Sequence, residues 1–205
     1  MAELTSLRRS PLAGIALDME VGTVTGKRQA RVSEQPFTTM VSLRADPMSP
    51  AAEAIERVLG AALPRTAGDV GTHGQHSVLW QGPDEWLVVS QTSADALVAA
   101  LRARLADAHA AVVDVSANRT VIELAGAAAR AVLQKGCPLD LHPRVFGPGR
   151  AVTTTLARVP LVLWQVGPDS YLLLPRTSFA DYVARWLLDA GQEFASDFQD
   201  GTGRR

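Results

Sequence analysis

The sequence predicts an α+β fold made of two split βαβ units, and two observations support this prediction. The first is the order of elements, because a strand, a helix, two strands, a helix and a strand can be read between residues 37 and 116. This βαββαβ order is typical of an antiparallel sheet with two helices on one face. The second is an internal repeat, in which LWQGPD at 79–84 returns as LWQVGPD at 163–169. The repeat predicts that the second half of the chain doubles the architecture of the first.

The first unit starts with the alternating segment TTMVSL, which indicates a strand within residues 37–43. Ser49 and Pro50 then suit the N-cap and the first position of a helix. The glycine-rich stretch 64–75 is expected to be a loop, because it carries one large apolar side chain. The remaining predicted elements are strands at 77–81 and 86–90, a helix that begins near Thr92 and Ser93, and a strand at 111–115.

The second unit is predicted from a strand at 120–124 that leads directly into a helix at 127–134. Further strands are expected at 151–156, 161–165 and 171–174, and Thr177 with Ser178 should cap a last helix. The spacing along this helix predicts a stripe that faces the core, made of Phe179, Tyr182, Val183, Trp186 and Leu187.

Four segments therefore describe the domain organisation. Residues 1–36 lack periodicity and are predicted to form an extended N-terminal arm, which either folds onto its own body or grips another chain. Residues 37–116 form the first lobe and 117–192 the second, and 193–205 are expected to be a flexible tail.

Composition limits the function classes. Hydrophobic residues make up 47% and charged residues 20% of the 205 residues, which predicts a globular chain without a membrane span. A formal charge of -1 without a basic block argues against nucleic acid as a partner. Asp18 and Glu20 interrupt the apolar run that follows the arginine pair at 8–9, so an export signal is rejected. The single cysteine suits a reducing compartment, and a cytoplasmic location is expected.

Isolated reactive residues do not add up to a catalytic set. Cys137 follows the C-terminal end of a predicted helix, where the helix dipole disfavours a thiolate, so a structural role is favoured over a nucleophilic one. His73 and His76 could both reach a metal ion, but no further ligand stands at a suitable spacing. Turn formation explains Asp84 and Asp169.

Aromatic and arginine side chains are the remaining candidates. The four tryptophans could stack on a pterin or flavin ring, although strand and helix-stripe positions favour core or interface roles; they are Trp80, Trp86, Trp164 and Trp186. No glycine-rich nucleotide motif is present. Arg119 and Arg144 lie in predicted loops and are the candidate contacts to a partner chain, with solvated surface positions as the alternative.

Four motifs, taken together and in order, resemble the gamma subunit of heterotetrameric sarcosine oxidase. They are LWQGPDEWLVV, VVDVSANRTVIELAG, ARAVLQKGCPLDLHPRVFGPG and LLLPRTSFADYVARWLLDAG. The resemblance covers about residues 40–192. It implies a fold similar to the folate-binding lobes of the glycine-cleavage T-protein, that is, two interlocked ferredoxin-like units.

The resemblance also implies an assembly with alpha, beta and delta subunits. Such a complex oxidatively demethylates sarcosine to glycine, transfers the one-carbon unit to tetrahydrofolate, and carries FAD, FMN, NAD and tetrahydrofolate on its larger subunits. No catalytic, cofactor-binding or metal-binding residue is implied for this chain, which is expected to be inactive alone. Lys135, Gly136 and Cys137 resemble a motif of T-protein relatives, but Pro138 departs from it. A folate-binding protein or aminomethyltransferase-like enzyme that acts alone is the alternative.

Overall fold

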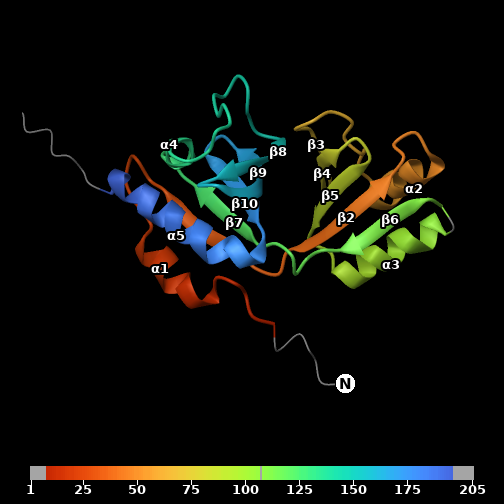
Figure 1. Cartoon of the computed structure of the whole chain (residues 1–205), viewed down its shortest axis with the longest axis horizontal. Helices are drawn as coiled ribbons and strands as arrows, with labels where there is room; N and C mark the ends of the chain where they lie inside the picture. Colours follow the sequence, from red (N-terminus) through yellow and green to blue (C-terminus); the bar gives the residue numbers. More distant parts are fainter. Residues whose placement is uncertain (1–7, 107, 196–205) are drawn as a thin grey trace, which may run out of the picture.

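The computed structural model describes residues 8–106 and 108–195, which form two five-stranded antiparallel sheets (Figure 1). The first sheet has the order β3-β4-β5-β2-β6 and the second the order β1-β7-β10-β9-β8. The first sheet consists of β2 (Thr39–Ala45), β3 (Val70–His73), β4 (His76–Gly82), β5 (Glu85–Ser90) and β6 (Ala110–Asp114). The second consists of β1 (Arg31–Gln35), β7 (Val121–Ala125), β8 (Arg150–Leu156), β9 (Val159–Gly167) and β10 (Ser170–Pro175).

Helices cover the outer face of each sheet, so that the two sheets lie in the middle of the molecule (Figure 1). The first sheet carries α2 (Pro50–Leu59) and α3 (Ala94–Leu105). The second carries α4 (Ala129–Gln134), α5 (Ala180–Gly191) and the short α1 (Ala16–Val21). Single 3₁₀ turns lie at Ala13–Ile15, Thr177–Phe179 and Gln192–Phe194.

Local sequence explains where the helices of the first unit begin and end. Ser49 caps α2, because its side chain accepts a hydrogen bond from the amide of Ala52, and Pro50 is the first helical residue. Gly60 ends α2 with a φ of 66°, a left-handed conformation that glycine adopts without a steric penalty. Ser93 caps α3 through the amide of Ala96. These capping predictions are confirmed.

Strand alternation divides the core into three layers. In β2, Val41 and Leu43 face the helices, whereas Met40, between Thr39 and Val41 in sequence, faces the second sheet. The third, inter-sheet layer joins apolar side chains of both sheets; its buried members are Met40, Leu79, Leu87, Val121, Ala151, Val162, Leu172 and Leu174. The two units therefore share one apolar layer and form one body.

Polar contacts also connect the two units. The guanidinium of Arg150 on β8 lies 2.6 Å from the carboxylate of Asp69, and the amide of Ala151 donates to the carbonyl of Gly68 at 2.9 Å. Asp69 and Gly68 precede β3 in the first unit, so these bonds fix the approach of the two sheets at one edge.

Of the two alternatives for the N-terminal segment, the structure shows residues 8–36 folded onto their own body, and they form regular elements in place of an extended arm. Within residues 8–36 the chain forms α1 and then β1, which pairs along its whole length with β7 at the edge of the second sheet. Leu12, Ile15 and Met19 are buried in the core of the second unit. The sequence hid this arrangement because β1 carries polar residues on both faces, with Val32 as its one fully buried side chain.

Two smaller differences concern the first hairpin and the last helix. The stretch 64–75, predicted as a loop, contains β3, because its backbone pairs with β4 although its side chains are small or polar. At the start of α5, the predicted cap fails: Thr177 donates its hydroxyl to the carbonyl of Ala117 instead. Of the predicted α5 stripe, Val183 and Leu187 are buried, whereas Phe179 and Tyr182 are 41% and 51% exposed.

The C-terminal tail prediction, residues 193–205, lies outside the described residues from 196 onward. Up to Ala195, the chain continues α5 as a 3₁₀ turn with Phe194 buried. Among the helices of the described ranges, none is long and apolar enough to cross a membrane.

Candidate functional site

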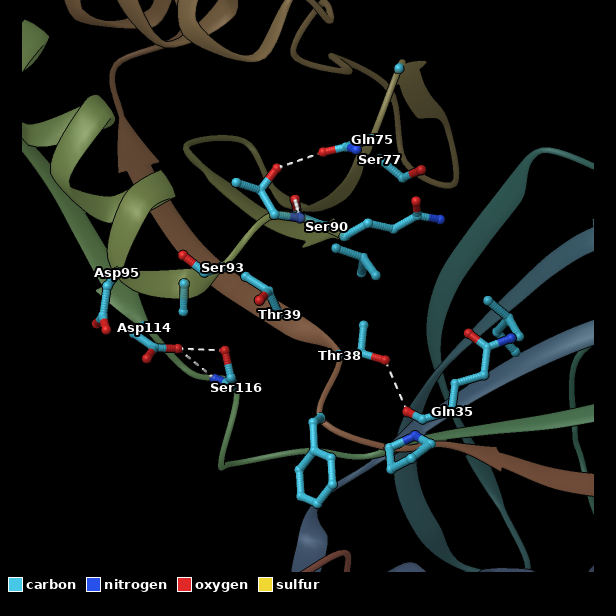
Figure 2. A pocket seen from close by; sticks show the side chains of 18 of the residues that line it. Gln35, Thr38, Thr39, Gln75, Ser77, Ser90, Ser93, Asp95, Asp114 and Ser116 are labelled. Atoms are coloured by element: carbon cyan, nitrogen blue, oxygen red, sulfur yellow. Dashed lines mark hydrogen bonds between the residues drawn. The ribbon is translucent and has the colours of Figure 1, made fainter. Parts of the chain in front are cut away.

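Within residues 8–106 and 108–195, the chain crosses between the two sheets twice, and a cavity of about 820 Å³ lies beside the first crossing (Figure 2). The first crossing, residues 36–38, connects β1 of the second sheet to β2 of the first. The cavity is bounded by this linker, by the end of β5 and the start of α3, and by Trp164 and Leu172 of the second sheet. Both units therefore contribute to its wall.

Hydroxyl groups and two carboxylates make up most of the polar lining. Thr39 and Ser90 are buried, with 8% and 4% of their surfaces exposed. The carboxylate of Asp114 accepts hydrogen bonds from the Ser116 amide at 2.9 Å and the Ser116 hydroxyl at 2.5 Å. Asp95 supplies the second carboxylate from the first turn of α3. With Arg8 as the one cation among the described lining residues, carboxylates outnumber cations, which favours a ligand that carries hydrogen-bond donors or positive charge.

A histidine lies next to the hydroxyl of Ser90. The Nδ1 atom of His76 is 2.9 Å from this hydroxyl, and burial, with a smaller contribution from His73, lowers the pKa of the His76 imidazole. A neutral imidazole can accept the hydroxyl proton, as in nucleophilic serine sites. However, Ser90 also accepts the amide hydrogen of Thr92 at 3.0 Å, which makes it part of the turn that follows β5. This pair was missed in the sequence because only the register of β4 against β5 places His76 opposite Ser90.

The first crossing contains a residue with an unusual backbone conformation. Phe37 has a backbone φ of 58°, which residues with a side chain of this size rarely adopt, and the residue is 49% exposed. The guanidinium of Arg8 lies over the ring at 5.0 Å from its centre, a cation–π distance. Arg8 and Phe37 both line the cavity.

The two candidate interface arginines have different surroundings. The guanidinium of Arg119 donates to the carbonyl of Leu174 at 2.8 Å, and burial, followed by the charge of Arg176, lowers its pKa. Arg119 therefore holds the second crossing, residues 115–120, against the end of β10. Arg144 is exposed on the loop between α4 and β8, where its amide donates to Nδ1 of His142.

The remaining candidates occupy local structural positions. Cys137 is a free thiol that is 9% exposed and lies 3.9 Å from the hydroxyl of Thr154. Asp84 pairs with Arg44 at 3.2 Å beside the β4–β5 turn. Within the described ranges, no group of three metal-ligating side chains is found, and His73 and His76 gain no third ligand.

The tryptophans are divided between core and cavity. Trp86 is buried and donates its indole hydrogen to the carbonyl of Pro64 at 2.8 Å. Trp80 is partly buried, and Trp186 packs over Gly136, where a Cβ atom would lie 2.6 Å from the ring. Trp164 alone among the four lines the cavity.

Comparisons with known proteins identify the family. Residues 44–193 match the sarcosine oxidase, gamma subunit family. The chain is 44% identical over 197 residues to the sarcosine oxidase subunit gamma of Corynebacterium sp. strain U-96, which covers 96% of each chain. Its structure is similar to a chain of the heterotetrameric sarcosine oxidase of Corynebacterium sp. U-96 in complex with pyrrole 2-carboxylate, with a TM-score of 0.90, 44% identity, and coverage of 93% and 97% of the two chains.

A more distant likeness concerns the fold alone. The glycine cleavage system aminomethyltransferase T of Bartonella henselae is similar with a TM-score of 0.59 at 14% identity. This likeness covers 84% of the present chain and 48% of that protein, so the predicted T-protein-like α+β fold is confirmed. The family match over most of the chain, together with the extent of identity to a curated relative, shows that the chain belongs to the sarcosine oxidase gamma subunit family.

Proposed function

We propose that the chain is a noncatalytic subunit that stabilises a sarcosine oxidase complex. The observation that carries this proposal is the close agreement, at a TM-score of 0.90, with a chain of a heterotetrameric sarcosine oxidase. The chemistry of the cavity also supports it. Its lining offers hydroxyls, amides and the carboxylates of Asp95 and Asp114, and the adjacent Ser90–His76 pair has its hydroxyl engaged by a backbone amide.

The proposed complex oxidatively demethylates sarcosine to glycine and transfers the one-carbon unit to tetrahydrofolate. Its FAD, FMN, NAD and tetrahydrofolate are held by the larger subunits, and the partners of this chain are the alpha, beta and delta subunits. The role of the chain in this complex is to provide folded surface to the other subunits.

The fold detail that we propose is a pair of interlocked ferredoxin-like lobes, residues 37–116 and 117–192. In the first sheet, the strands β6, β2, β5 and β4 lie in the spatial order that a βαββαβ unit requires, with β3 added at the edge. In the second sheet, β7, β10 and β9 repeat the positions of β2, β5 and β4, and β1 takes the place of β6. Because β1 precedes the first lobe in sequence, the two lobes are linked by strand exchange.

Arg144 remains a proposed contact to a partner subunit, because its side chain is exposed on a long loop. Arg119 is proposed only as an indirect contributor, since its guanidinium already donates within the chain. Arg144→Ala should weaken assembly without lowering the stability of the isolated chain. Unchanged assembly of this variant would remove Arg144 from the interface.

Coexpression with the larger subunits tests the proposed function. The tagged chain should copurify with flavin-bearing subunits and should show no sarcosine turnover when purified alone. Turnover or a tightly held flavin in the single chain would overturn the noncatalytic role, and purification without partners would overturn the role in the complex.

A second candidate function is favoured by the cavity itself. With about 820 Å³ and Trp164 in its wall, it has the size and an aromatic surface for a pterin ring. The chain would then bind folate alone or act like an aminomethyltransferase. Calorimetric titration with tetrahydrofolate separates the candidates, because saturable heat at micromolar concentration supports the second and its absence removes it.

A further inference from the structure

The two crossings between the sheets are related by the internal repeat but differ in length. The first spans residues 36–38 between β1 and β2, and the second spans residues 115–120 between β6 and β7. The longer linker packs against the start of the last helix. There, the amide of Thr177 donates to the carbonyl of Asn118 at 2.9 Å, and Arg119 donates to the carbonyl of Leu174 at 2.8 Å.

The shorter linker leaves the equivalent place in the first unit open. The start of α3 corresponds to the start of α5, since Thr92 and Ser93 repeat Thr177 and Ser178. No segment of the described chain lies against the start of α3 as residues 117–119 lie against the start of α5, and the 820 Å³ cavity occupies that place. The cavity is thus the counterpart of a site that an arginine-bearing segment fills in the second unit.

A pair of equivalent threonines shows the same difference at atomic detail. In the second sheet, Ile122 of β7 pairs with Glu34 of β1, and Thr120 lies two residues before Ile122. The Thr120 hydroxyl donates to the Glu34 carboxylate at 2.6 Å. In the first sheet, Val41 of β2 pairs with Asp114 of β6, and Thr39 lies two residues before Val41. These two threonine and acid positions are equivalent in the two sheets.

In the first unit this bond is missing. The Asp114 carboxylate is turned to Ser116, and the Thr39 hydroxyl makes no hydrogen bond within residues 8–106 and 108–195, although the residue is only 8% exposed. The Thr39 hydroxyl is not among the fully buried unsatisfied polar atoms of the described residues, so it is open to the cavity and available to a polar group that enters there.

The charged side chains that line the cavity indicate which charge a group bound there would carry. Asp95 and Asp114 both line it, and neither forms an ion pair with another described residue. Figure 2 shows both carboxylates on the side of the cavity formed by Ser93 and Ser116. Arg8, which also lines the cavity, lies over the ring of Phe37, so a guanidinium is accommodated beside this linker.

We propose that the cavity binds an extended, arginine-bearing segment of a partner subunit. The segment donates to the Asp95 and Asp114 carboxylates and bonds the Thr39 hydroxyl, and it takes the place beside α3 that residues 117–119 take beside the start of α5. This inference rests on the proposed function, because it requires a complex with another chain.

The test compares the affinity of variants for the purified partner subunits. Thr39→Val removes a hydroxyl that makes no hydrogen bond within the described residues, so it should change the stability of the isolated chain little, yet weaken binding about tenfold. Asp95→Asn should also weaken binding about tenfold, whereas its matched control Asp189→Asn, on the exposed side of α5, should not. Thr120→Val, the matched control for the hydroxyl, should destabilise the isolated chain because it breaks the bond to Glu34.

A photoreactive residue in place of Gln75 identifies the occupant. Gln75 is exposed and lines the cavity, so the cross-linked peptide in the complex should come from a partner and contain arginine. A cross-link to the N-terminal residues of the same chain, or wild-type affinity of both Thr39→Val and Asp95→Asn, overturns the docking site alone. If the wild-type chain does not bind the partner subunits at all, the proposed function fails as well.

Discussion

Truncation of one inter-sheet leucine should destabilise both units at once. Leu79 on β4 has 0% of its surface exposed and packs with side chains of the second sheet such as Val162 and Leu172. Leucine-to-alanine changes in well-packed cores cost about 2–5 kcal/mol, and with little room to collapse between two sheets we expect about 3 kcal/mol for Leu79→Ala. A loss of 3 kcal/mol raises the population of the unfolded chain about 100-fold.

Hydrogen exchange measured by mass spectrometry can follow each sheet separately. In the Leu79→Ala variant, amides of β4 in the first unit and of β10 in the second should both exchange about 100-fold faster. The control Leu17→Ala, at a side chain that is 69% exposed, should change stability by less than about 0.5 kcal/mol. If β4 loses protection while β10 keeps its wild-type rates, the two units unfold independently and the shared layer does not couple them.

Three further predictions concern single contacts. Gly126→Ala should destabilise the pairing of β1, because its φ is 125° and a Cβ atom would lie 2.3 Å from the carbonyl oxygen of Gln29; limited proteolysis of residues 8–36 reports the loss. Trp86→Phe should lower the free energy of unfolding by about 1–3 kcal/mol in urea titration, because the Pro64 carbonyl loses its buried donor. Burial lowers the pKa of His76 in the folded state, so the folded chain binds its proton less readily than the unfolded chain. Its contribution to stability is therefore complete above the ordinary value of 6.5 and falls as the pH drops below it, and His76→Gln should flatten this part of a urea midpoint against pH curve.

Most of the fold could be predicted from the sequence, because in most strands and helices the apolar pattern of the side chains matches the element that the backbone forms. The repeated LWQ hairpins became β4–β5 and β9–β10, and Ser49 and Ser93 cap the helices that they were expected to cap. The pattern failed for β1 and β3, whose residues are held by backbone bonds to a neighbouring strand. A strand of this kind shows little apolar periodicity, because it is stabilised by backbone hydrogen bonds to the neighbouring strand and not by burial of its own side chains.

The candidate site was less accessible, because its geometry depends on register and on linker length. Arg119 was singled out as a loop arginine, but its role follows from the carbonyl of Leu174, which lies 55 positions away. The Ser90–His76 pair and the open Thr39 hydroxyl become visible only when the strands are aligned. The cavity could not be predicted for the same reason, because the sequence of a three-residue linker does not show whether the space beside it is filled.

The exchange of β1 explains why an asymmetric site can arise in a doubled fold. The second sheet takes its edge strand from the start of the chain, so the first crossing must run directly from β1 into β2, and residues 36–38 span the gap with Phe37 in a left-handed conformation. The second crossing has twice that length and can fold back onto the start of α5. A short, constrained linker leaves the polar ends of β2 and β5 uncovered, whereas a long one covers them. The topology that joins the two sheets therefore also leaves the first of them with hydroxyls and carboxylates that line the cavity.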